Sequence, residues 1–164
     1  MKITIIYGSK YGTTKNLARY FGESLSAEVY EVNESIDIHD SDIIVLGSPV
    51  YAGTVNKSLK LWVSTHQKEL LDKQVFIFLC GLQTDKGNKV IQENLGKEFF
   101  STLCYVECLG GVIDYSKMNF IEKKIINMIN KKAHMFVYDK QIEVYNMLQE
   151  KRILNFIQKI YDKK

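Results

Sequence analysis

Five apolar runs of strand length, most of them separated by helical patterns, constrain the fold of this sequence more than any other feature. The runs are rich in β-branched and aromatic residues and span residues 2–7, 28–33, 42–48, 74–80 and 103–110. Strands that are almost continuously apolar are typical of parallel sheets that helices cover on both faces. The pattern therefore predicts an α/β fold with a five-stranded, doubly wound parallel sheet.

Apolar residues at helical spacing mark the segments between these runs. They indicate one helix that begins near Thr14, a second around residues 59–66, and a third carrying Ile91, Leu95 and Phe99. A last amphipathic helix carries Ile157 and its neighbours, and its start lies between residues 142 and 151.

The second run, residues 28–33, is half polar and therefore fits an edge strand. This placement favours the strand order 2-1-3-4-5, in which ligands bind outside the carboxyl ends of the strands, where the order reverses. We therefore expect a site in the loops that follow Tyr7, Ser48 and Cys80.

Length and composition exclude several classes of protein. With 164 residues, 46% hydrophobic and 25% charged, the sequence fits a single globular domain over residues 1–164. Three cysteines without a Cys-x-x-Cys pair predict a reduced, cytoplasmic protein, and neither a signal peptide nor a spanning segment is evident. A net charge of +3 is too small to favour nucleic acid. The three dispersed histidines do not predict a metal site, and no catalytic set is recognisable by spacing.

The turn after the first strand carries glycines and hydroxyl groups immediately before a helix. Unpaired amides at a helix N-terminus, together with the side chains of Ser9, Thr13 and Thr14, can hold a phosphate, and Gly12 lets the backbone approach closely. The alternative is an ordinary helix capped by Thr13 or Thr14. Neither the Gly-x-Gly-x-x-Gly nor the Walker pattern fits this turn.

Ser9-x-Tyr11-Gly12-x-Thr14 resembles the phosphate loop of flavodoxins. The segment 47–54 is similar to the second flavin loop of that family, the segment 81–85 to its third, and Gly110-Gly111 follows the fifth strand as in several members. The resemblance implies non-covalently bound FMN, with Tyr51 stacking on the ring and the Ala52-Gly53 backbone facing N5. The implied cofactor-binding residues are Ser9, Lys10, Tyr11, Gly12, Thr13, Thr14, Pro49, Val50, Tyr51, Ala52, Gly53, Gly81, Leu82, Gln83, Thr84 and Asp85.

The sequence departs from soluble flavodoxins in its basic charge, in a third loop without an aromatic residue, and in an insertion at residues 114–140. This segment holds the whole net charge of +3 and predicts a basic amphipathic helix, with its isoleucines around Ile125. It resembles the insert of menaquinone-dependent protoporphyrinogen oxidase, a flavodoxin-like enzyme that works at the membrane. The alternative is an ordinary helix that packs its isoleucines on the core.

The first expectation for function is an FMN-dependent electron carrier or oxidoreductase, with a redox partner protein or a small-molecule or quinone acceptor. One alternative is an enzyme of the protoporphyrinogen oxidase type, with peripheral contact to the inner face of the membrane through residues 117–132. Another is a flavin-less interaction module with the same fold.

Overall fold

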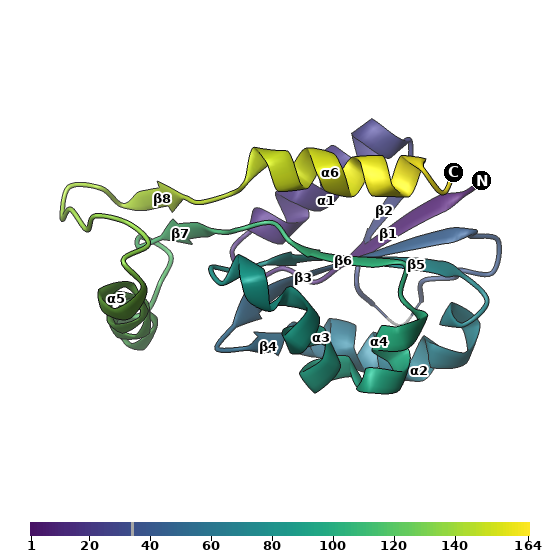
Figure 1. The fold of residues 1–164 in the computed structure, drawn as a ribbon, viewed down its shortest axis with the longest axis horizontal. Coiled ribbons are helices and arrows are strands. Elements are labelled where there is room, and N and C mark those ends of the chain that lie inside the picture. Colours follow the sequence, from purple (N-terminus) through teal and green to yellow (C-terminus); the bar gives the residue numbers. More distant parts are fainter. Residues whose placement is uncertain (34) are drawn as a thin grey trace.

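The computed structural model describes residues 1–33 and 35–164, and its centre is a parallel sheet (Figure 1). The sheet has the order β2-β1-β3-β5-β6, and β4 pairs antiparallel with the end of β3. Without the two-residue β4, this is the predicted order 2-1-3-4-5. The strands are β1 (Ile3–Tyr7), β2 (Glu28–Glu31), β3 (Ile43–Tyr51), β4 (Thr54–Val55), β5 (Gln74–Cys80) and β6 (Tyr105–Cys108).

Helices cover both faces of this sheet, as the apolar strands require. α1 and α6 lie on one face, and α2, α3 and α4 lie on the other (Figure 1). Alternate residues of each strand supply the two cores, so Ile5 packs beneath α1 and α6 while Ile6 packs on the side of α2. The helices are α1 (Thr13–Leu25), α2 (Lys57–Leu70), α3 (Gly87–Leu95), α4 (Lys97–Thr102), α5 (Phe120–Ala133) and α6 (Glu150–Tyr161).

Two of the predicted elements differ from those observed. The third helix is divided into α3 and α4 at Gly96, whose φ of 92° breaks the helical path although Ile91 and Phe99 are buried as expected. The third strand continues past Ser48 to Tyr51, because its last residues pair with β4. Pro49 and Val50 therefore lie in a strand rather than in a loop.

The insertion forms a separate feature that we call the lobe, residues 112–146. It consists of α5 and of an antiparallel pair, β7 (Val112–Asp114) and β8 (Val144–Asn146), which the apolar pattern did not predict. The lobe projects from the end of the molecule opposite the two termini (Figure 1).

The predicted amphipathic helix is thus present as α5, but its isoleucines do not pack in the core. The structure describes every residue of α5, and none of them is buried. Among the residues described, no helix combines the length and the apolar character needed to cross a bilayer.

Candidate cofactor-binding site

Two adjoining cavities lie at the carboxyl ends of the parallel strands. The larger, of about 310 Å³, is bounded by the β3–β4 turn, the loop after β5 and the helix α5. The smaller, of about 60 Å³, lies beside the start of α1. The two cavities form one continuous site, because seven residues line both of them. These residues are Lys10, Val50, Tyr51, Gly81, Leu82, Met118 and Ile126.

The N-terminus of α1 opens on the smaller cavity without a capping side chain. Gly12 is the N-cap residue at a φ of 97°, and within the described part of the chain no side chain caps this helix. By contrast, Asn56 caps α2 by accepting from the amide of Leu59, and Asn119 caps α5. The expected alternative, a cap by Thr13 or Thr14, is wrong. The first amides of α1 thus remain available to an anion.

The β3–β4 turn places one aromatic ring at the rim of both cavities. Ala52 and Gly53 form its two central residues at φ values of 49° and 75°, a conformation that suits a two-residue hairpin. The carbonyl oxygen of Gly53 accepts a hydrogen bond from Asn94 Nδ2 at 2.8 Å. Tyr51, 40% exposed, meets Tyr11 edge to face with ring centroids 6.0 Å apart.

The loop after β5 is held from two sides. The amide of Gly81 donates to the carbonyl of Gly110 at 3.0 Å, which joins this loop to the end of β6. Gly81, Leu82 and Gln83 line the larger cavity. Thr84 and Asp85 belong instead to a short 3-10 helix and line neither cavity, and the Thr84 carbonyl faces Arg152 of α6 at 3.5 Å.

One face of α5 lies over the larger cavity. Its residues Ile125, Ile126 and Ile129 line that cavity together with Met118, which precedes the helix. The same cavity is lined by Val50 and Leu79 of the main sheet, Leu82 of the loop after β5 and Val90 of α3. The space is therefore mostly apolar, with Tyr51 at its rim, and suits an aromatic ring system.

Glu122 joins the start of α5 to the turn before α1. Its carboxylate accepts hydrogen bonds from the Lys10 ammonium and the Tyr11 hydroxyl, and from the amide of Asn119 at 3.0 Å. The Lys10 ammonium also lies 5.3 Å from the centre of the Tyr51 ring. The hydrogen bond from Lys10, followed by that from Tyr11, lowers the pKa of Glu122 from 4.5 to about 2.

Most of the sequence matches a known protein family. Residues 4–136 match the flavodoxin domain family, a span that includes the main sheet except Ile3, the residues that line both cavities and the whole of α5. The chain belongs to the flavodoxin domain family. No curated protein matches the sequence significantly.

Solved structures of flavodoxins share the fold at low sequence identity. The flavodoxin of Streptococcus pneumonia TIGR4 is 12% identical, with a TM-score of 0.56 over 100% of both chains. Megasphaera elsdenii flavodoxin is 17% identical, with a TM-score of 0.54 over 65% of this chain and 84% of that one. A Lactobacillus acidophilus NCFM flavoprotein, solved in complex with FMN, is 20% identical, with a TM-score of 0.51 over 67% of this chain and 92% of that one.

The flavodoxin fold brings most of the predicted site residues together. The cavities are lined by Ser9, Lys10, Tyr11, Thr13, Thr14, Pro49, Val50, Tyr51, Ala52, Gly53, Gly81, Leu82 and Gln83, and Gly12 lies between lining residues. Sequence reasoning predicted the amphipathic helix but did not include Glu122 or the isoleucines of α5 among the site residues. The spacing of Glu122, Ile125, Ile126 and Ile129 places them on one helix face, which was a usable signal.

The cysteines at this site are structural rather than reactive. Cys80 and Cys108 are buried free thiols beneath the two cavities. Burial raises the pKa of Cys80 to about 12, so the thiolate is not the form present near neutral pH. Within residues 1–33 and 35–164, no three His, Cys, Asp or Glu side chains gather in a way that could hold a metal ion.

A Glu122→Gln variant should reveal the contact between α5 and Lys10 through its pH dependence. Because folding lowers the pKa of Glu122, the ionised contact stabilises the fold fully above pH 4.5 and is lost as the pH falls through about 2. Across that range, the unfolding free energy from urea titrations should fall less steeply in the variant than in the wild type. Glu93→Gln, which removes only the exposed pair with Lys89 at 3.7 Å, is the control. Parallel curves for wild type and Glu122→Gln would refute the contact.

Proposed function

We propose that the protein binds FMN and acts in electron transfer or oxidoreduction. The observation that carries this proposal is the uncapped N-terminus of α1, which opens on a small cavity that continues into a larger apolar one beside Tyr51. An anion-binding helix end next to an apolar space with an aromatic rim fits a phosphate joined to a planar ring. Membership of the flavodoxin domain family and the FMN complex of the Lactobacillus acidophilus flavoprotein support the same proposal.

Each part of the proposed site would contact a different part of FMN. The first amides of α1, with Ser9 and Thr13, would hold the phosphate, while Tyr51 would stack on the ring. The carbonyl of Ala52 is the better candidate to face N5, because Asn94 already donates to the carbonyl of Gly53. Bound FMN would supply the transfer of electrons, and the isoleucines of α5 would shield its ring from water.

A visible spectrum and a Tyr51→Ser variant test the proposal. The purified protein should bind FMN and quench its fluorescence, and the variant should bind it roughly 5- to 150-fold more weakly, since stacking on an aromatic ring contributes about 1–3 kcal/mol. Tyr30→Ser is a matched control, because Tyr30 is also 40% exposed but lies on the edge strand β2. Failure of the wild type to bind FMN would favour the flavin-less interaction module.

A second candidate is an enzyme of the protoporphyrinogen oxidase type with a quinone acceptor. The position of α5 favours it, because a helix over the ring cavity hinders a protein partner more than a small flat molecule. Turnover of protoporphyrinogen with menaquinone by the FMN-loaded protein should then exceed that of free FMN. A rate equal to that of free FMN would leave the electron-carrier proposal.

A further inference from the structure

Exposed apolar side chains are concentrated on the lobe. Of the sixteen large hydrophobic residues that are exposed in the described chain, eight lie between residues 112 and 146. The most exposed of these are Val137 at 89%, Phe120 at 81%, Ile121 at 67% and Met128 at 55%. A globular protein rarely exposes so many apolar groups in one region unless the region meets another surface.

The apolar residues of α5 divide into two faces. Ile126 and Ile129 line the larger cavity, whereas Phe120, Ile121 and Met128 are turned to solvent. Helical spacing places Ile121, Lys124, Met128 and Lys132 along this second face. We call it the outer face of α5. Since the inner face already borders the cavity, the outer face is left without a covering element among the described residues.

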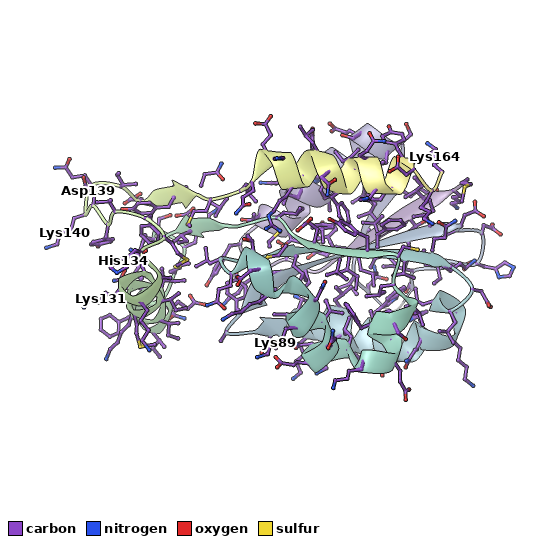
Figure 2. The ribbon with its side chains drawn as sticks, in the orientation of Figure 1. Lys89, Lys131, His134, Asp139, Lys140 and Lys164 are labelled. Carbon is purple, nitrogen blue, oxygen red and sulfur yellow. The ribbon has the colours of Figure 1, made fainter. Side chains whose placement is uncertain are left out.

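The exposed side chains of the lobe carry a net positive charge. Four exposed lysines form no ion pair with any residue that the structure describes, namely Lys124, Lys131, Lys132 and Lys140. Glu122 pairs with Lys10 and Asp114 with Lys117, whereas Asp139 and Glu143 are exposed without an ion pair to any residue that the structure describes. The exposed lysines of the lobe outnumber these two carboxylates. Figure 2 shows Lys131, His134, Asp139 and Lys140 together on the lobe, at the end of the molecule opposite Lys164.

We propose that the outer face of α5, together with the segment that carries Val137, docks on a bilayer that contains anionic lipid. Lysines mixed with large apolar groups on one helix face match the boundary between charged headgroups and acyl chains. A second copy of this chain fits less well, because a symmetric contact between two such faces would bring lysines close to lysines. The lobe projects from the rest of the molecule (Figure 1), and its residues Phe120, Met128 and Val137 are exposed.

This docking can be measured separately from FMN binding. The full chain, with and without FMN, is sedimented with vesicles of phosphatidylglycerol mixed with phosphatidylcholine, and with vesicles of phosphatidylcholine alone. We expect at least roughly tenfold stronger binding to the anionic vesicles, weakened by added salt. Binding that does not depend on FMN would support docking even if the proposed redox function failed.

Variants locate the contact on the lobe. Replacing Lys124, Lys131 and Lys132 by Gln should weaken binding to anionic vesicles by roughly 100-fold, and Phe120→Ser with Met128→Ser should weaken it further. The matched control replaces Lys57, Lys60 and Lys68 of α2 by Gln, the same change in charge on another exposed helix. Leu61→Ser with Leu71→Ser, at residues 62% and 57% exposed, is the control for the apolar pair.

Three outcomes would overturn the proposal. One is equal binding to neutral and anionic vesicles, or no binding to either kind of vesicle. Another is an equal loss of binding in the α2 control and in the lobe variant. The third is a dimer in light scattering that dissociates in Phe120→Ser, since this would assign the outer face to a second copy. Circular dichroism of each variant verifies that the fold is retained.

Discussion

Gly12→Val should bind FMN at least roughly 100-fold more weakly than the wild type in a fluorescence titration, a loss of about 2.7 kcal/mol. Gly12 holds the start of α1 at a φ of 97°, which a β-branched residue adopts only at a cost of about 1–3 kcal/mol. A Cβ at this position would meet no atom within 4 Å, so the cost comes from the backbone rather than from a clash. Relaxation of the turn would move the first amides of α1, and hydrogen bonds to a charged group contribute about 1.5–3 kcal/mol each.

Gly96→Val is the control, because it reproduces the backbone strain away from the site. Gly96 has a φ of 92°, and a Cβ there also meets no atom within 4 Å, but it lies between α3 and α4 and lines neither cavity. It should destabilise the fold to a similar extent and leave the affinity for FMN unchanged. Riboflavin, which lacks the phosphate, should bind the wild type far more weakly than FMN does. Equal affinity for the two flavins would contradict the assignment of α1 to the phosphate.

The order of the central strands could be predicted because a strand that is buried on both faces is apolar along nearly its whole length. β1, β3 and β5 are almost continuously apolar, and the half-polar β2 lies at an edge, where its side chains reach water. The phosphate turn was predictable for a similar reason. A strand, a glycine turn and a helix follow one another directly, so local sequence alone brings Gly12 and Thr14 to the end of β1.

The position of α5 could not be predicted, because contacts between distant parts of the sequence determine it. Glu122 binds Lys10, which lies 112 residues away in the sequence, and no local sequence pattern predicts that pair. β7 and β8 are only three residues long each, too short to give an apolar run, yet they fix where α5 starts and where the chain returns. An amphipathic pattern predicts that a helix has an apolar face, but it does not say whether that face borders a core or a cavity.

Phe156→Ala should destabilise the protein by about 3–5 kcal/mol, the range for removing a fully buried aromatic side chain. Phe156 is 0% exposed, and its ring lies between α6 and the sheet, with centroid distances of 5.4 Å to Phe21, 6.0 Å to Phe78 and 6.2 Å to Tyr105. No single residue of the described α6 can replace these contacts, since Ile160 is the only other residue of this helix that is buried. The loss is a large fraction of a typical stability of about 5–15 kcal/mol.

Leu154→Ala is the matched control on the same helix, because Leu154 is 52% exposed and its removal leaves no cavity. Urea unfolding should give a change within about 0.5 kcal/mol for Leu154→Ala, as for most surface substitutions. α6 also supports the site indirectly, since Arg152 faces the carbonyl of Thr84 in the short 3-10 helix that follows the cavity-lining loop. Phe156→Ala should therefore weaken FMN binding by less than Gly12→Val does, because it loosens one support of that loop and leaves the start of α1 intact. A loss below about 1 kcal/mol for Phe156→Ala would mean that α6 does not pack on the sheet through this ring.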